Sequence, residues 1–435
     1  IPAGVTLTNS GTATGFGSDS DISWQSVQTS SFTAVAGRGY PINTTGGAIT
    51  LTLPASPSAG DMVAIVDYAG TFGSNAVTLN RNSSNIQGTA ANGSIATNKR
   101  AVSLLYVDAT KGWIPVNDNT TDNYGAQYVT ATGGTVATVG DYKIHSFTSS
   151  SNFVVSDDGN ADGSNSVDYL VVGAGGGSGN SNGGGGGAGG FRMASGLSVS
   201  QTTYPITIGA GGGANTCGPA SGGPGATNGS NSVFATITSA GGGRGGSGKG
   251  SGPYGVGGDG GSGGGGGTNN QANGSGNTPP VSPAQGTDGG NGAGPGTPQP
   301  QAGGGGGGAS QAGGSHKPAG GSAYGGDGSP AAPIFGSAPQ PFYIANGSNH
   351  GASADGVFAG GGGGGRCSSN TGGMGLPNGE PGGTGGGGNS THNCTQGYAG
   401  VANTGGGAGG GGYSPPGSGN TGGSGIVLIR YKYQG

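Results

Sequence analysis

The sequence predicts an all-β protein in which a small N-terminal β module precedes a β-sandwich with long glycine-rich insertions. Short runs of Val, Ile, Thr and Tyr alternate with turn-forming clusters, which is typical of strands. Glycine supplies 116 of the 435 residues and only 7% are charged, far from the averages of globular proteins. Large apolar side chains are too few for a core of that size. Much of the chain must therefore bury backbone, which glycine permits because it has no Cβ.

The N-terminal module is predicted to span residues 20–123, after an N-terminal segment of residues 1–19 and before a glycine-rich part of residues 124–435. About 15 of the glycines precede residue 126, and so sharp a change in composition indicates separate modules. The stretch "RAVSLLYVDATKGWIPV" predicts a final hairpin with its turn at "ATKG". The predicted core of the module consists of Trp24, Trp113, Leu51, Leu53, Val63, Ile65, Leu79, Leu104 and Tyr106.

The glycine-rich part contains a second set of strand-like runs. They include "VDYLVVGA", "TYPITIGA", "SVFATITSA" and, near the end, "SGIVLIRYKY". Because the last run lies far along the chain from the others, the simplest architecture is one β-sandwich whose connections are glycine-rich excursions. An apolar strand such as "IVLIRY" is a liability at an open edge, so we expect it to pair with an earlier strand of the same sandwich.

The residues alone allow two interpretations of the glycine tracts, a flexible linker or a bundle of packed helices. Collagen is excluded because runs such as "GGSGGGGGTNNQ" keep no three-residue glycine period. A flexible linker explains the composition, but not the recurrence of an apolar strand followed by "GAGGG" or "SAGGG". The alternative is a bundle of extended polyglycine II helices, which satisfy their backbone groups by packing side by side. A bulky substitution such as Gly264→Val is then expected to disrupt the packing.

The ordered series "GDYKIHSFTSSSNFVV", "DYLVVGAGGGSG", "YPITIGAGGG", "AGGGGGGR" and "GGSGIVLIRY" resembles the glycine-rich domain of bacteriophage tail fibres and related virion adhesins. The resemblance covers about residues 126–433. Residues 20–117 are similar to a small β module that is frequent in tail-fibre proteins. The resemblance implies a jelly-roll-like β-sandwich with inserted bundles of polyglycine II helices.

The same resemblance implies a function, a location and partners. The expected location is the virion, outside the cell, and tail fibres are usually homotrimers. The expected partners are other virion proteins and a host surface polysaccharide or outer-membrane protein, bound through variable loops. The rival interpretation is a purely structural virion decoration or extracellular fibre subunit that selects no receptor.

Segments that interrupt the tracts are the candidate binding loops: residues 268–302, 316–350, 366–382 and 389–404. The most aromatic stretch, "PIFGSAPQPFYIANGSNH", contains Phe335, Phe342, Tyr343 and His350, and exposed aromatic rings beside Asn and Ser suit a sugar or a protein loop. The other reading is that these rings only pin the loop to the glycine bundle. Arg366 is a further binding candidate. Cys367 and Cys394 are candidates for a disulfide, with three reduced cysteines as the alternative.

A calcium loop is the one metal site that the sequence suggests. Asp158, Asn160 and Asp162 follow the D-x-N-x-D-G spacing, with Asp168 nearby as a substitute for the missing glutamate. The alternative interpretation of these residues is a surface turn rich in Asp, Asn and Gly.

Other functions find little support. "GAGGGS" has Ser178 where a dinucleotide fingerprint needs a third glycine. The acids are scattered singly and no histidine lies in a nucleophile motif, so no enzyme is predicted. Lys and Arg form no run, which argues against nucleic-acid binding. No apolar stretch is long enough for membrane insertion, and "IPAGVTLTNS" lacks the layout of a signal peptide.

Overall fold

The computed structural model describes residues 22–116, 127–160, 163–215, 225–248, 254–294, 302–315, 323–344, 350, 356–366, 379–391, 396–412 and 419–434. The chain forms two compact units, Ile1–Tyr128 with Gly159–Ser164, and Val129–Asp158 with Asn165–Gly435. We call them the N-terminal unit and the glycine-rich unit. The predicted division at residues 123 and 124 falls outside the described residues. The predicted all-β class is confirmed, since α1 (Ala332–Phe335) is the one α-helix of the described parts.

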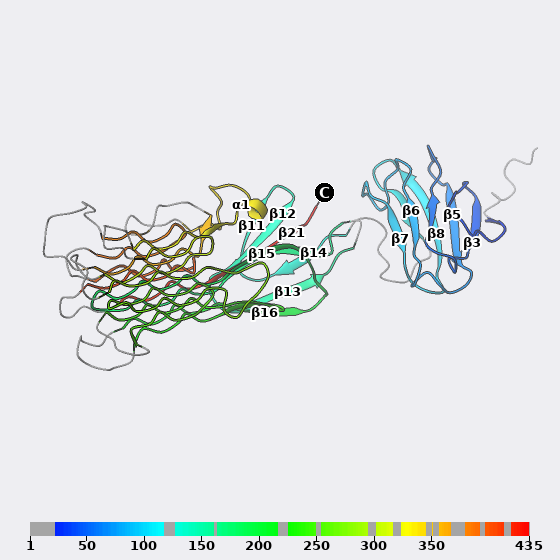
Figure 1. Ribbon diagram of the computed structural model, residues 1–435. Coiled ribbons are helices and arrows are strands. Elements are labelled where there is room, and N and C mark those ends of the chain that lie inside the picture. The colour runs from blue at the N-terminus through cyan, green and yellow to red at the C-terminus, as the bar shows by residue number, and fades with distance from the viewer. Residues whose placement is uncertain are drawn as a thin grey trace, which may run out of the picture. The chain divides into compact units, whose positions relative to one another are not determined.

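The N-terminal unit consists of two sheets (Figure 1). The strands are β1 (Ser23–Trp24), β2 (Phe32–Thr33), β3 (Arg38–Ile42), β4 (Ile49–Thr52), β5 (Met62–Asp67), β6 (Val77–Asn80), β7 (Gly93–Ile95), β8 (Ala101–Asp108) and β9 (Gly112–Pro115). Their orders are β1-β3-β5-β8-β9 and β2-β4-β6-β7. The first six strands alternate between the sheets and pair in parallel. The predicted hairpin is confirmed, with Tyr106 opposite Trp113 across β8 and β9.

The core of the N-terminal unit agrees with the predicted one except at Trp24. Trp113 is fully buried together with Leu51, Leu53, Leu79 and Leu104, and Tyr106 packs against this core. Trp24 is instead 54% exposed. The reason is its position on β1, a two-residue edge strand, where the ring lies over Gly39 rather than between the sheets. The prediction that Trp24 belongs to the core is therefore wrong.

The glycine-rich unit contains two five-stranded sheets that form the predicted sandwich. One has the order β10-β13-β16-β17-β18 and the other β11-β12-β21-β14-β15. The strands are β10 (Thr130–Thr132), β11 (Thr135–Val139), β12 (Tyr142–Phe147), β13 (Ser151–Asp157), β14 (Ser166–Val172), β15 (Phe191–Ser198), β16 (Thr203–Thr207), β17 (Ser232–Phe234), β18 (Ile237–Ser239) and β21 (Ile426–Lys432). Side chains from both sheets share one apolar core. β19 (Ser329–Pro330) and β20 (Val357–Phe358) form a separate two-stranded sheet.

The last strand, β21, pairs with β12 on one side and β14 on the other, which confirms the prediction that it joins earlier strands. Its first four residues are fully buried. Val427 and Ile429 face the core between the sheets, whereas Ile426 and Leu428 face a second apolar core that includes Phe335 and Phe358. A strand buried on both faces explains the continuous apolar run in its sequence.

Figure 1 shows the glycine tracts running side by side away from the sandwich strands. The tract of residues 183–190 donates its N–H groups to three other tracts in rotation, at N···O distances of 2.7–3.0 Å. The same partner tract recurs at every third residue, which is the period of the polyglycine II helix. None of the eight residues has a positive φ, as the left-handed extended helix requires. The donor and acceptor pairs are 184 with 246, 187 with 243, 190 with 240, 185 with 304, 188 with 307, 186 with 408 and 189 with 405.

The carbonyl groups of the same tract accept from three further tracts. Gly179, Gly265 and Gly362 donate to residues 184, 185 and 186. Residues 183–190 are thus surrounded by six tracts, and backbone hydrogen bonds replace the side-chain core of an ordinary domain. Glycine is required by this spacing, because a Cβ on Gly185 would lie 2.1 Å from the carbonyl oxygen of Gly362. The prediction of packed polyglycine helices agrees with these contacts.

Two of the predicted loops belong partly to this bundle. Gly274 donates to Gly264, and Gly290 donates to Gly305, so much of residues 268–302 runs as tracts. In the segment 389–404, Tyr398 and Gly400 also bond to neighbouring tracts. The expectation that these whole segments are surface loops is therefore wrong, because polar residues are tolerated wherever their side chains point out of the bundle.

Acid is expected to destabilise the glycine-rich unit through His145, which is fully buried on β12. Its Nδ1 lies 2.7 Å from the carbonyl oxygen of Gly133 and its Nε2 lies 3.1 Å from the Tyr431 hydroxyl. Burial lowers the pKa of His145 below its ordinary value of 6.5, although the bond to Gly133 opposes this shift. The unfolded chain therefore takes up a proton below about pH 6.5 that the folded chain refuses.

The free energy of unfolding should thus fall by up to about 1.4 kcal/mol per pH unit as the pH drops below about 6.5, until the folded pKa is reached. Denaturant titrations between pH 7.5 and 5 measure this slope. His145→Gln should remove most of it. An equal slope in the His145 variant would contradict the assignment.

Candidate functional site

The predicted aromatic loop packs against the sandwich. Phe335 and Phe342 are only 3% and 5% exposed, and their rings meet edge to face with centroids 6.2 Å apart. Both belong to the second apolar core, beside Leu428 of β21. The expectation that these two rings are exposed to a ligand is wrong, because they pack against an apolar face of the sheet. Their burial agrees with the alternative interpretation, in which they pin the loop.

Tyr343 is held in the same way. Its hydroxyl donates to the carbonyl group of Gly336 at 2.6 Å, and its ring packs near Phe358 with centroids 6.1 Å apart. Burial raises the pKa of Tyr343 to about 12. The hydroxyl is therefore part of the loop's own structure.

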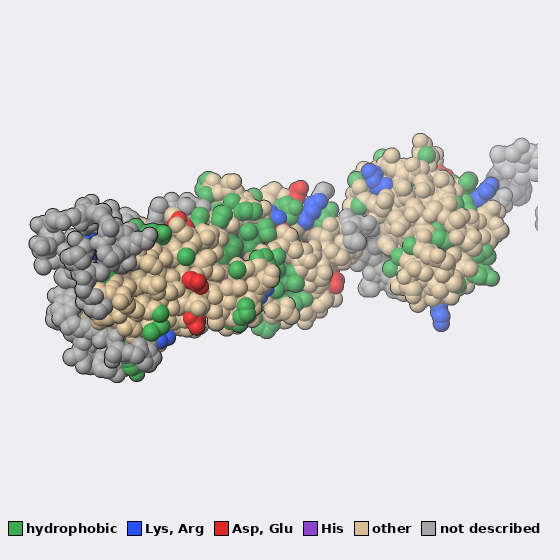
Figure 2. Space-filling view, viewed as in Figure 1, with side chains coloured by type: hydrophobic (Ala, Val, Ile, Leu, Met, Phe, Trp, Pro, Cys, Tyr) green, Lys and Arg blue, Asp and Glu red, His purple; other side chains and the backbone are tan. Residues whose placement is uncertain are grey.

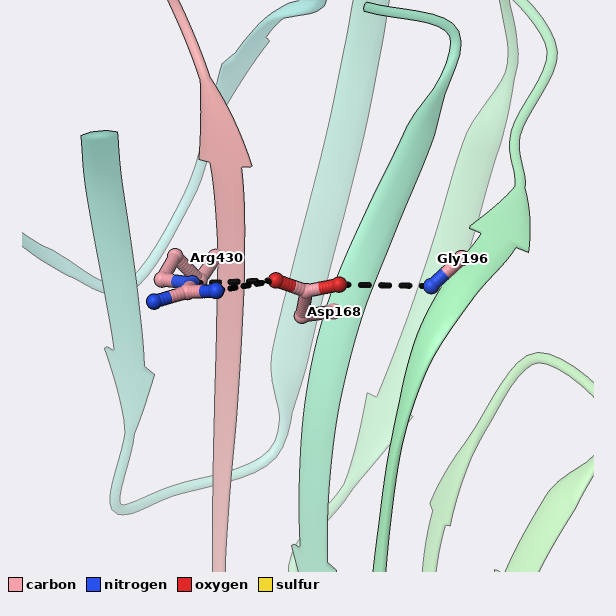
Figure 3. A network of polar contacts seen from close by, with 3 residues as sticks. All are labelled: Asp168, Gly196 and Arg430. Atoms are coloured by element: carbon pink, nitrogen blue, oxygen red, sulfur yellow. Dashed lines mark hydrogen bonds and ion pairs between the residues drawn. The ribbon is translucent and has the colours of Figure 1, made fainter. Parts of the chain in front are cut away.

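An ion pair on the sandwich joins the last strand, β21, to β14 (Figure 3). Arg430 of β21 donates through Nε and Nη2 to Oδ2 of Asp168 on β14, at 3.0 and 2.6 Å. The other oxygen of Asp168 accepts the N–H of Gly196 in β15. The guanidinium also lies over the ring of Tyr142, 4.3 Å from its centroid, and 5.9 Å from that of Phe335. One side chain thus contacts two neighbouring strands and the aromatic loop.

Arg430→Ala is expected to lower the free energy of unfolding of the glycine-rich unit by about 3 kcal/mol, because it leaves a largely buried carboxylate unpaired. Chemical denaturation measures the change. Arg192→Ala is the matched control, since Arg192 on the adjacent strand β15 makes one exposed bond to the Thr238 carbonyl group and should cost less than about 1 kcal/mol. Equal losses in both variants would show that the ion pair has no special role.

The other two binding candidates also make contacts within the bundle. His350 pairs with Gly388 in an isolated antiparallel bridge. Arg366 pairs in the same manner with Ala302, and its Nη1 lies 3.9 Å from Oε1 of Glu380. A receptor-binding role for either residue stays a prediction.

The predicted calcium loop is described only in part. Oδ1 of Asn160 accepts the N–H groups of Gln127 and Gly163 at 3.0 and 2.9 Å, as in a turn closed by an asparagine side chain. Asp162 lies outside the described residues, and Asp168 is engaged by Arg430. In the parts that the structure describes, no group of three His, Cys, Asp or Glu side chains is arranged to hold a metal ion. Calcium binding therefore stays a prediction, as does the Cys367–Cys394 disulfide, whose two cysteines are outside these parts as well.

The tracts place a layer of polar side chains at the end of the bundle remote from the sandwich strands, which we call the distal end. Asn215 donates from Nδ2 to Ser247 Oγ at 2.6 Å and to Asn180 Oδ1 at 3.3 Å. Thr268 donates to the carbonyl group of Gly248. Side-chain hydrogen bonds thus fix the distal end where the backbone bonds of the tracts run out. The buried polar residues of this layer are Asn180, Ser181, Asn182, Asn215, Ser247, Thr268, Glu380, Asn389 and Ser390.

Three exposed tyrosines lie on the glycine tracts, and the sequence analysis did not single them out. Tyr254, Tyr324 and Tyr398 are 46%, 37% and 37% exposed. Each is set among small residues, in "GPYGV", "SAYGG" and "QGYAG". That setting is the signal that could have found them, since a bulky side chain inside a tract fits only where it points out of the bundle.

The visible face of the tracts carries few charges, whereas hydrophobic side chains gather over the sandwich strands (Figure 2). The described residues contain no helix that is long and apolar enough to cross a bilayer. The tracts thus present exposed phenol groups on a hydrogen-bonded support.

Comparison with known proteins concerns the glycine-rich unit. No curated protein matches the chain. The model of a family described as a glycine-rich domain matches residues 148–432, a range that begins near the start of β13 and ends with the last residue of β21. Because the match spans more than half of the chain and contains the tracts and the sandwich strands from β13 onward, this protein belongs to the glycine-rich domain family.

Proposed function

We propose that the protein is a virion fibre component or adhesin that binds a host surface receptor at the distal end of its glycine tracts. The observation that carries the proposal is the combination of a hydrogen-bonded glycine bundle with a polar distal end. A bundle of this kind holds surface groups in fixed positions, and preorganised groups lose less entropy on binding. The resemblance to bacteriophage tail fibres supplies the virion location and the bacterial host.

As part of this proposal, the protein acts by binding rather than by catalysis. It works as a homotrimer with other virion proteins and does not bind nucleic acid. Sedimentation equilibrium tests the assembly state, with a mass of about three chains of 40.4 kDa expected. A single-chain mass at micromolar concentration would contradict the trimer and leave the binding role to be judged separately.

Binding of the fluorescently labelled full chain to a panel of bacterial strains tests the function. The proposal predicts saturable binding to some strains and not to others. A purely structural virion decoration or fibre subunit predicts no strain-selective binding. A uniform absence of binding over a broad panel would therefore count against the adhesin and favour the structural role.

A further inference from the structure

The sheet β1-β3-β5-β8-β9 of the N-terminal unit is apolar on both sides. Its inner side chains, among them Val63, Ile65 and Leu104, belong to the core that it shares with the second sheet. Side chains alternate along each strand, so the residues between these inner positions point to the opposite side, which we call the outer face. The outer-face residues of the paired strands are Trp24, Gly39, Pro41, Met62, Ala64, Val66, Ala101, Ser103, Leu105 and Ile114.

The pairing of the strands arranges these residues in three rows across the sheet. The middle row consists of Trp24, Gly39, Ala64 and Ser103. One flanking row consists of Met62, Leu105 and Ile114. The other consists of Pro41, Val66 and Ala101. The middle row is thus built from small residues apart from Trp24, whose ring lies over Gly39 at the edge of the sheet.

The outer face is left uncovered within the N-terminal unit. Its side chains join none of the apolar clusters of the described residues, and Met62, Val66 and Leu105 are partly exposed. Yet the sequence of β5 is "MVAIVD", a continuous apolar run of the kind found in strands that are buried on both faces. The sequence of this strand therefore indicates that another surface covers the outer face.

The outer face suits contact with a second copy of itself. None of its residues is charged, and Ser103 supplies the one hydroxyl group among them. Identical copies bring identical side chains together near their symmetry axis, where a charge would meet its own copies. Interfaces between permanently associated copies are also apolar, like a domain core that has been divided.

Other occupants match this face less well. Residues 1–21, which precede the sheet, are rich in Gly, Ser and Thr and include Asp19 and Asp21, so they offer few apolar side chains. An interface with a different protein usually carries about ten direct hydrogen bonds, for which the outer face has few side-chain partners. The same face of another copy of the chain avoids both mismatches.

Resting on the assembly of copies that is part of the proposed function, we propose that the outer faces of the copies pack against one another. The Trp24 ring, 54% exposed in the single chain, then lies in the interface, and Trp is enriched among the residues that contribute most to such contacts. The contact involves the N-terminal unit and uses no residue of the glycine tracts.

Sedimentation equilibrium of full-chain variants tests this contact. Leu105→Lys and Ile114→Lys each place a charge at a partly exposed position, which the single chain tolerates but which assembly brings beside its own copies. We expect the dissociation constant to rise by at least about 100-fold. Val35→Lys is the matched control, because Val35 is an exposed valine of the same unit between β2 and β3, and it should assemble as the unaltered chain does. An unchanged mass in both variants of the outer face overturns the inference while the assembly itself stands.

Acrylamide quenching of tryptophan fluorescence is the second measurement. The chain has two tryptophans and Trp113 is fully buried, so the quenching reports Trp24. We expect weak quenching in the assembled chain and strong quenching in single chains, obtained by dilution or with Leu105→Lys. Strong quenching in the assembled chain overturns the inference, and so does weak quenching in single chains, because Trp24 is then covered by its own chain. A single-chain mass of the unaltered protein at every concentration overturns both the inference and the trimer, and binding to bacterial strains then tests the receptor function separately.

Discussion

Gly264→Val is expected to abolish the cooperative fold of the glycine-rich unit. A Cβ at this position would lie 1.9 Å from the carbonyl oxygen of Arg244 and 2.5 Å from its carbonyl carbon. Both are backbone atoms of a neighbouring tract, so rotation of a side chain cannot relieve the overlap. Gly264 also donates to Gly258 and accepts from Gly274, and moving it would disturb three tracts at once. We expect a loss of more than about 4 kcal/mol, above the usual cost of overpacking.

The matched control is Gly213→Ala. Gly213 lies in the same unit, and the nearest atom to an added Cβ is Thr227 Oγ1 at 3.4 Å, which is an ordinary contact. Calorimetry should show the transition of the glycine-rich unit lost in Gly264→Val and nearly unchanged in Gly213→Ala. The chain has two tryptophans, Trp24 and Trp113, and both lie in the N-terminal unit. Tryptophan fluorescence therefore reports that unit alone and should be unaffected by either variant.

A chain that ends at Gly425, and so lacks β21, should also fail to form the glycine-rich unit. Ile426, Val427, Leu428 and Ile429 are fully buried and contribute to the cores on both faces of the sheet. Burial of each such side chain contributes about 1.5–3 kcal/mol, so four of them approach the whole stability of a typical domain, about 5–15 kcal/mol. The deletion also leaves β12 and β14 without the strand that lies between them.

Circular dichroism and calorimetry of the shortened chain measure this effect. A chain ending at Tyr433 is the control, because it keeps β21 and removes the exposed Gln434. If the transition of the glycine-rich unit persists without β21, the tracts fold independently of the sandwich.

The strands were predictable because their signals are local. The apolar runs that became β14 and β21, and the hairpin of β8 and β9, are visible in a short window of sequence. The pairing of β21 followed from one physical argument about open edges. The repeated change from an apolar strand to "GAGGG" was enough to favour packed tracts over a linker.

The neighbours of each tract could not be predicted. Backbone hydrogen bonds between glycines are alike wherever they occur, so nothing in the tract 183–190 specifies that residue 184 bonds to 246 and residue 185 to 304. For the same reason, the sequence does not predict that much of residues 268–302 runs inside the bundle.

The burial of Phe335 and Phe342 could not be predicted for a different reason. Aromatic side chains in a sequence indicate a binding loop only where they are exposed, and Phe335 and Phe342 are buried against an apolar sheet face. That face is built from distant strands, so a short window of sequence does not reveal it. Trp24 shows the reverse case, a large apolar ring left exposed by a short edge strand. The sequence does not predict the exposure of Tyr254, Tyr324 and Tyr398. It depends on which side of each tract faces away from the bundle.

Amide hydrogen exchange of residues 183–190 tests the central claim, that the glycine tracts are a hydrogen-bonded scaffold. Residues 184–190 all donate their N–H groups to another tract, and the tract is buried throughout. We expect protection comparable to that of β21, lost only when the whole unit unfolds. Exchange at the rate of an unstructured chain would contradict the scaffold and favour a flexible linker.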